Sequence, residues 1–174
     1  MTETTKELLI RPISADDCRR FPELFAAQGW TRQAALFEKY LQEQTAGLRF
    51  VRVAETAGTP CGYVTLVPLA KEGPFKGRLP EIVDFNVLEA WQGRGIGTAL
   101  LDEIEQLAVE KLNAATISLG VGLHTGYGPA QRLYVKRGFV PDGSGVWYHN
   151  VPLTPYTDCR NDDDLVLYLS KSLA

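Results

Sequence analysis

The sequence predicts a single α/β domain, residues 1–174, in which a mixed β-sheet carries helices on its faces. Three observations lead to this prediction. The length of 174 residues fits one domain of ordinary size. Hydrophobic residues make up 45% and charged residues 22% of the chain, which are globular proportions and argue against disorder. Segments with strand or helix periodicity follow one another along the chain without an internal repeat or low-complexity tract.

The chain opens with a strand and two helices. Glu7–Ile13 is rich in apolar residues and is expected to form the strand. Ser14 is a suitable cap for a helix over residues 15–28. Pro22 lacks a backbone N–H, and we expect it to interrupt that helix. The second helix, over residues 31–45, places its apolar side chains on roughly one face.

Three strands and a long loop occupy the middle of the chain. Residues 49–55 and 61–69 are expected to pair through a turn that contains glycine and proline. Residues 71–80 contain two glycines and two prolines and are expected to form a loop. Residues 81–88 have the composition of a strand.

The remainder alternates between helices and strands. A glycine-rich turn leads into the clearest helix, residues 96–112, whose apolar side chains recur at helical spacing. Residues 115–123 form a strand, and a short helix follows between Gly128 and Gly138. Two last strands begin at residues 139 and 164. The predicted order is therefore β, αα, βββ, α, β, α, ββ, which is a mixed sheet with helices on its faces.

Charge and hydropathy argue against nucleic-acid and membrane partners. Lys and Arg total 18 against 21 Asp and Glu, so the net charge is −3, unlike that of a general phosphate-neutralising protein. No apolar run approaches the roughly 20 residues of a membrane helix. The polar start Met1–Glu7 lacks the apolar stretch of a secretion signal. We therefore expect a cytoplasmic protein.

Cysteine and histidine usage argues against a metal centre. Cys18, Cys61 and Cys159 are odd in number and form no CxxC pair, so free thiols are expected. Only two histidines are present, which also weakens any Ser-His-Asp proposal. We expect no metal cofactor.

The turn over residues 92–98 has the chemistry of a phosphate cradle. Its glycines let backbone N–H groups point toward one anion without a Cβ in the way. The following helix adds its own unpaired N–H groups and partial positive charge. Side-chain donors are available from Gln92, Arg94 and Thr98.

Three known phosphate loops can be compared with this turn. The P-loop requires Gly-Lys-Ser/Thr, which does not occur, and the dinucleotide fingerprint requires glycine where Thr98 stands. These departures disfavour a nucleotide-binding protein. A third pattern, Q/R-x-x-G-x-G/A, is satisfied by Gln92-Gly93-Arg94-Gly95-Ile96-Gly97. The structural alternative for this short pattern is a glycine-rich corner between a strand and a helix.

The surroundings of the turn resemble a known family. Residues 81–101 are similar to the coenzyme A-binding motif of the GNAT superfamily of N-acetyltransferases, and Ala130–Phe139 resembles the family's A-x-x-L-Y-x-x-x-G-F helix. The order of elements is similar from Glu7 to Leu173. The resemblance implies a mixed, mostly antiparallel sheet flanked by helices, which splays between the fourth and fifth strands and leaves a slot for the cofactor.

The resemblance also implies the activity and the cofactor contacts. Acetyl would pass from acetyl-coenzyme A (acetyl-CoA) to an amine by direct attack in a ternary complex. Backbone amides of the 92–97 turn would hold the pyrophosphate, and the preceding strand would pair with the pantetheine arm. Tyr127 stands where the family often has an asparagine that contacts pantetheine, and it is expected to pack against the cofactor instead. The cofactor-binding residues so implied are Phe85, Asn86, Val87, Leu88, Gln92, Gly93, Arg94, Gly95, Ile96, Gly97, Thr98 and Tyr127.

Two carboxylates are candidates for the catalytic base. An alkyl amine is mostly protonated at neutral pH, so a base or a water chain must remove its proton. Glu81 lies eleven residues before Gln92, as the catalytic glutamate does in the histone-type branch of the family, and it ranks first. Asp84 is an odd number of residues away and faces the opposite side of an ideal strand. The alternative is that both are solvated carboxylates at a strand edge.

Tyr134 is the candidate acid. It matches the family's tyrosine, whose hydroxyl can protonate or hydrogen-bond the departing thiolate. The alternative is a core tyrosine, because Ala130, Leu133 and Tyr134 share one helical face.

Two function classes remain after these assignments. The first is an N-acetyltransferase acting on a small-molecule or protein amine. The second is a non-catalytic acyl-CoA sensor or interaction module with the same fold, which would need neither a base nor Tyr134. Polyamines, amino acids, aminoglycosides and other antibiotics, and protein amines are all open as acceptors. A homodimer is expected only because many relatives are dimers.

Overall fold

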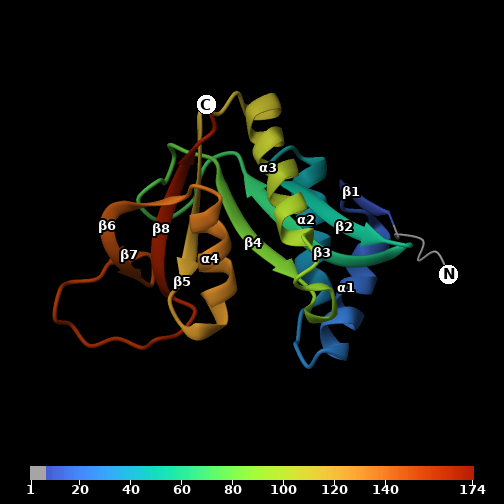
Figure 1. The fold of residues 1–174 in the computed structure, drawn as a ribbon, viewed down its shortest axis with the longest axis horizontal. Coiled ribbons are helices and arrows are strands. Elements are labelled where there is room, and N and C mark those ends of the chain that lie inside the picture. Colours follow the sequence, from blue (N-terminus) through green and yellow to red (C-terminus); the bar gives the residue numbers. More distant parts are fainter. Residues whose placement is uncertain (1–6) are drawn as a thin grey trace. The chain divides into compact units, whose positions relative to one another are not determined.

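The computed structural model describes residues 7–174, so the polar start Met1–Glu7, apart from Glu7 itself, lies outside the described residues. The predicted order of helices and strands is confirmed, and a two-residue strand and two short 3₁₀ helices are added (Figure 1). The elements are β1 Leu8–Pro12, α1 Ala15–Ala27, α2 Ala34–Thr45, β2 Phe50–Thr56, β3 Thr59–Val67, β4 Glu81–Val87, η1 Glu89–Trp91, α3 Ile96–Leu112, β5 Thr116–Gly122, η2 Thr125–Tyr127, α4 Gly128–Lys136, β6 Val140–Tyr148, β7 Val151–Pro152 and β8 Leu165–Ser172.

The chain forms two compact units. The first, here called the N-terminal unit, contains the residues up to Leu66 together with Asp84–Gln106. The second, the C-terminal unit, contains Val67–Val83 and Leu107–Ala174. The strand β4 and the helix α3 therefore each contribute residues to both units. The assignment of residues 1–174 to one domain stays a prediction.

The sheet of the N-terminal unit is built on two antiparallel pairings. β1 pairs with β2, and β2 pairs with β3, which is the neighbour of β4. Ala57 and Gly58 connect β2 to β3, with φ angles of 50° and 76°. A two-residue hairpin loop needs positive φ at both of its residues to match the right-handed twist of the strands it connects.

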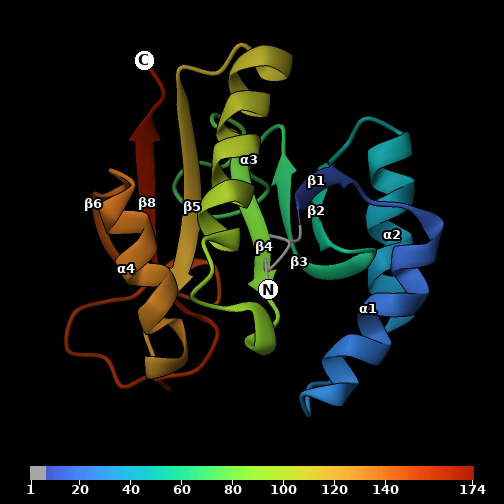
Figure 2. The same cartoon turned by 45° about the vertical axis from the view of Figure 1, so that its right-hand side comes forward.

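Helices cover both faces of this sheet. In Figure 1, α2 lies behind the strands and α3 in front of them, and Figure 2 shows α1 beside α2. The α1–α2 side is an aromatic core of Phe21, Phe25, Phe37 and Tyr63, packed on alternate residues of β2. On the other face, Arg52 Nε donates to Glu103 Oε1 of α3 at 3.0 Å.

Pro22 does not interrupt α1, and that expectation was wrong. The helix runs from Ala15 to Ala27 with Pro22 inside it. Phe21 and Phe25, on either side of the proline, are buried in the same core. Their packing holds the two halves in one helix and outweighs the lost backbone hydrogen bond.

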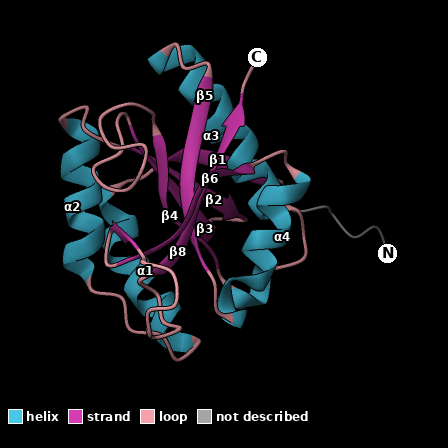
Figure 3. Cartoon of the chain, turned by 90° about the vertical axis from the view of Figure 1, so that its left-hand side faces the viewer, coloured by secondary structure: helices cyan, strands magenta, loops and turns pink. Residues whose placement is uncertain are grey.

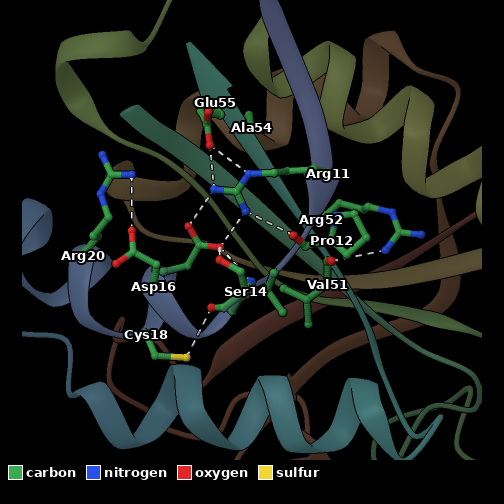
Figure 4. Close-up of polar contacts among 12 residues, drawn as sticks. Arg11, Pro12, Ser14, Asp16, Cys18, Arg20, Val51, Arg52, Ala54 and Glu55 are labelled. Atoms are coloured by element: carbon green, nitrogen blue, oxygen red, sulfur yellow. Dashed lines mark hydrogen bonds and ion pairs between the residues drawn. The ribbon is translucent and has the colours of Figure 1, made fainter. Parts of the chain in front are cut away.

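A buried carboxylate fixes the start of α1. Asp17 is fully buried and accepts hydrogen bonds from Arg11 at 2.6 and 2.8 Å and from the backbone N–H of Ser14 at 2.8 Å. Arg11 Nε also donates to Glu55 of β2 at 2.8 Å (Figure 4). Burial alone would raise the pKa of Asp17, but the hydrogen bonds from Arg11 and Ser14 outweigh it and lower that pKa. One arginine thus ties β1, α1 and β2 together.

The C-terminal unit contains one parallel pairing and three antiparallel ones. β4 and β5 pair through Glu81 with Ser118 and Ile82 with Leu119, while the pairings β5–β8, β8–β6 and β6–β7 are antiparallel. The helix α4 covers one face of this part of the sheet (Figures 1 and 3). A mixed, mostly antiparallel sheet flanked by helices is thereby confirmed. Within residues 7–174, no helix has the length and apolar character needed to cross a membrane.

Candidate active site

The glycine turn after β4 is open and exposed. Gln92 through Gly95 are exposed, and the φ angles of Gly93 and Gly95 are 73° and 79°. A Cβ added at either glycine would meet no atom within 4 Å. The Gln92 amide donates to the Val87 carbonyl at 3.0 Å, and the Arg94 guanidinium lies 5.0 Å from the centre of the Trp91 ring. These side chains hold the shape of the turn and leave its backbone accessible.

The backbone of this turn offers unused hydrogen-bond donors. The Ala99 N–H donates to the Gly95 carbonyl at 3.0 Å, so α3 begins there. Within the described part of the chain, the N–H groups of Gly95, Ile96, Gly97 and Thr98 have no hydrogen-bond partner. Unpaired donors at the positive end of a helix bind anions well. The exposed turn therefore fits a pyrophosphate held by backbone groups.

Some groups of the strand segment before the turn already make hydrogen bonds and packing contacts within the protein. The Leu88 N–H donates to the Cys61 carbonyl at 2.9 Å, and the Leu88 side chain is buried in the aromatic core. Asn86 donates its side-chain amide to Asp84 Oδ1 at 2.7 Å. Phe85 and Val87 are half-buried. Contacts from this segment to a pantetheine arm would therefore come from its backbone, as the resemblance implies.

Asp84 lies in a cluster of hydrogen-bond donors. Tyr40 and Tyr63 each donate a hydroxyl to Asp84 Oδ2 at 2.7 Å, and Arg32 Nη1 lies 3.6 Å from the same oxygen. Burial, followed by the charge of Asp84, raises the pKa of both phenols, which stay protonated donors at neutral pH. Asp84 has a φ of 63°, a left-handed conformation that is unusual inside a strand. Its carboxylate is thus engaged by the protein.

Glu81 has different surroundings. It is half-buried at the start of β4, and its buried Oε2 has no hydrogen-bond partner within residues 7–174. Burial first, and the charge of Glu72 second, raise the pKa of Glu81 from 4.5 to about 7. A carboxylate with a pKa near the working pH is suited to act as a general base. Of the two candidate carboxylates, only Glu81 keeps an uncommitted oxygen.

Tyr134 is buried in α4 and packs against Phe139, with 5.7 Å between the ring centres. Burial first, and Tyr127 second, raise the pKa of its hydroxyl. It therefore stays protonated at neutral pH, and its hydroxyl can donate a hydrogen bond.

Tyr127 covers the end of β5. A Cβ added at Gly122 would lie 2.3 Å from the Tyr127 ring, so only glycine fits beneath it. The Tyr127 hydroxyl donates to Asp163 Oδ1 at 3.0 Å, and His124 Nε2 lies 2.8 Å from the same oxygen. Its polar group is therefore directed to Asp163, and a contact with the cofactor stays a prediction.

Sequence patterns did not reveal the partners of Asp84. Tyr40 and Tyr63 are 44 and 21 residues away along the chain, and Arg32 lies in the loop between α1 and α2. No short motif joins them, because the packing of α2 on the sheet brings them together.

All three thiols are free, with Cys18 and Cys61 buried and Cys159 exposed. Among residues 7–174, no three His, Cys, Asp or Glu side chains are grouped to hold a metal ion.

Comparison with known proteins identifies the family. The sequence matches the Acetyltransferase (GNAT) family over residues 12–139, more than half of the chain. The protein belongs to the GNAT acetyltransferase family. No curated protein matches its sequence at a significant level.

Solved structures share the GNAT fold over nearly the whole chain. A GNAT-family acetyltransferase from Desulfovibrio desulfuricans aligns with a TM-score of 0.71 and 16% identity, covering 97% of this chain and 100% of its own. A spermidine N-acetyltransferase SpeG chimera from Vibrio cholerae and hSSAT has a TM-score of 0.68 at 20% identity, with 95% of each chain covered. The Salmonella typhimurium acetyltransferase yncA, solved with acetyl-CoA, has a TM-score of 0.67 at 20% identity, covering 96% and 94%. At these identities the likeness establishes the fold.

Proposed function

We propose that this GNAT-family protein is an N-acetyltransferase that transfers acetyl from acetyl-CoA to an amine by direct attack in a ternary complex. The observation that carries the proposal is the exposed glycine turn at the start of α3, with four unpaired backbone N–H groups. Bound acetyl-CoA supplies an acetyl thioester. The backbone of residues 93–98 would hold its pyrophosphate, and the backbone of residues 85–87 would hold its pantetheine arm.

Glu81 is proposed as the base. Glu81 accepts one proton of the ammonium group, and the neutral nitrogen then forms a bond to the acetyl carbon as the carbon–sulfur bond breaks. The second proton that the nitrogen loses neutralises the departing thiolate. The uncommitted Oε2 of Glu81 and its pKa of about 7 support this role. Asp84 is proposed to shape the strand, because two phenols and an amide already occupy its carboxylate.

Tyr134 is proposed to stabilise the leaving thiolate with a hydrogen bond. A thiol has a pKa near 8.5, below that of an ordinary phenol near 10, and burial raises the pKa of Tyr134 further. Full proton transfer from the phenol would therefore be unfavourable, whereas a hydrogen bond is not. Tyr134→Phe should lower kcat less than loss of the base does.

The first test measures release of free coenzyme A on incubation with acetyl-CoA and a panel of amines. With an accepted amine, Glu81→Gln should lower kcat/KM about 10²- to 10⁴-fold while the Kd for acetyl-CoA changes little. For the wild type, kcat/KM should rise with pH through an inflection near 7, as Glu81 loses its proton, and the variant should lack that inflection.

Two outcomes would contradict parts of this proposal. If Glu81→Gln keeps both the activity and its pH dependence, and Asp84→Asn loses both, the roles of the two carboxylates are exchanged. Tight binding of acetyl-CoA without coenzyme A release for any amine would favour the non-catalytic acyl-CoA sensor.

A further inference from the structure

A hollow lies beside the loop between α1 and α2, within the N-terminal unit. Its volume is about 270 Å³, and its lining residues are Pro22, Ala26, Gly29, Trp30, Thr31 and Arg32. Arg32 carries the only charge among these six residues. Trp30 is 44% exposed, which is unusual for a large aromatic side chain, and its ring stacks on Phe25. The hollow thus combines an apolar wall with one cation.

The N–H donors of the Arg32 guanidinium are available for a ligand. Its nearest anionic partner, Asp84 Oδ2, is 3.6 Å away, which is beyond hydrogen-bonding distance for a guanidinium. The guanidinium centre lies 5.5 Å from the centre of the Phe25 ring, which supports its plane without using an N–H. Within the described chain, Arg32 makes no side-chain hydrogen bond. Its side chain is 29% exposed, whereas that of Asp84 is 14% exposed.

Asp84 offsets part of the Arg32 charge but occupies none of its N–H donors. Its Oδ2 already accepts two phenol hydrogen bonds and its Oδ1 accepts the Asn86 amide. The carboxylate is therefore stabilised without a guanidinium hydrogen bond. The charge of Asp84 and the Phe25 ring hold Arg32 in place, and Arg32 lines the hollow.

We propose that Arg32 binds a carboxylate of the acceptor substrate, so that the acceptor is a small amine that carries a carboxylate, with its apolar part against Trp30. This inference rests on the proposed acetyl transfer. A guanidinium offers a carboxylate two parallel N–H donors, and a partly buried charge-assisted pair of this kind is strong and directional. The same cation repels a polyamine, which has no anionic group to offer. Asp84, the ion-pair partner of Arg32, immediately precedes the β4 residues proposed to hold pantetheine.

The decisive experiment compares matched acceptors that differ only in the carboxylate. Phenylalanine is paired with phenethylamine, and lysine with 1,5-diaminopentane. The wild type should show a kcat/KM at least tenfold higher for the acid of an accepted pair, and Arg32→Gln should reduce that ratio at least tenfold, toward one. Arg19→Gln removes the same charge from an exposed position on α1 and should leave the ratio unchanged. Equal kcat/KM for acid and amine in the wild type would overturn the inference.

A binding measurement separates this inference from the proposed activity. N-acetylphenylalanine and N-acetylphenethylamine are titrated into the protein by calorimetry, with no turnover. The carboxylate compound should bind at least tenfold more tightly to the wild type, and Arg32→Gln should abolish the difference. If no amine is acetylated but this difference is found, the proposed function fails and the carboxylate site stands. If both compounds bind equally, the site is refuted whatever the activity. Should Arg32→Gln fail to fold, Arg32→Lys keeps the charge but loses the paired donors, and it should show an intermediate difference.

Discussion

Glu81 and Asp84 are three residues apart on one strand, yet their environments differ in a way that spacing does not reveal. Strand alternation predicts opposite faces for the two side chains, but it assumes an extended backbone, and Asp84 has a φ of 63°. It could not indicate that Tyr40 and Tyr63 would engage Asp84, because these partners come from α2 and β3. Nor could it indicate the buried Oε2 of Glu81, since burial depends on the surrounding packing. The sequence could rank the two candidates only through the family resemblance.

The raised pKa of Glu81 predicts a pH-dependent cost to stability. In the unfolded chain the carboxyl ionises near 4.5, but in the folded chain only near 7. Between these values the folded protein holds a proton that the unfolded chain has lost, so stability from this group falls as the pH rises. Above pH 7 the full penalty applies, at most about 3 kcal/mol for a shift of this size.

Glu81→Gln should therefore be more stable than the wild type at pH 8, and this advantage should shrink steadily toward pH 5. Urea unfolding at several pH values measures the difference in free energy of unfolding. Glu89→Gln, at an exposed position next to the same strand, provides the control and should show no such trend. A difference that is constant with pH would mean that Glu81 ionises normally in the folded protein.

At the scale of elements, periodicity was sufficient for type and order but not for every boundary. The helix α3 and the strands β2 to β5 lie within a few residues of their predicted ranges. Pro22 was misjudged because local preference was outweighed by the burial of Phe21 and Phe25. The two-residue strand β7 has no periodicity of its own and exists only through its pairing with β6.

The glycine turn is the element whose backbone the proposed function needs most. Gly95→Asp places a negative charge and a side chain among the unpaired N–H groups at the start of α3. The Kd for acetyl-CoA should rise at least tenfold, because like charges repel and the donors become obstructed. Titration of the folded variant with acetyl-CoA measures this change.

Gly58→Asp is a matched control for that variant. Gly58 also has a positive φ, 76°, with open space around it, but it lies in the turn between β2 and β3. Both variants should lose similar stability from backbone strain. Unchanged acetyl-CoA affinity in Gly95→Asp, or an equal loss in Gly58→Asp, would contradict a specific role for the 92–98 turn.

At the scale of the whole molecule, the order of elements was predictable, but the long-range partners were not. Periodicity led to a mixed sheet with helices on its faces, and the motifs at 81–101 and 130–139 added, through the family they resemble, that the sheet is mostly antiparallel. The hydrogen bonds from Arg11 to Asp17 and Glu55 have no sequence signature, because Glu55 is 44 residues from Arg11. The hollow beside Arg32 has no sequence signature either, because Asp84, the ion-pair partner of Arg32, comes from β4. Such features arise only when helices pack on a sheet.

If the chain is one domain, a substitution that destabilises the N-terminal unit should also destabilise the C-terminal unit. A tryptophan in the C-terminal unit can report this through its fluorescence. Asp17→Asn in the N-terminal unit breaks a buried ion pair and should cost about 3 kcal/mol. Replacing Trp30 and Trp91 by Phe leaves Trp147, which packs on Tyr168 in the C-terminal unit, as the only tryptophan. Because β4 and α3 supply residues to both units, a single cooperative transition is expected, and Trp147 fluorescence should report the full destabilisation. Asp16→Asn, at the exposed neighbouring position, should change stability by less than about 1 kcal/mol. If Asp17→Asn shifts the circular-dichroism transition but leaves the Trp147 transition in place, the two units unfold independently and the chain is not one domain.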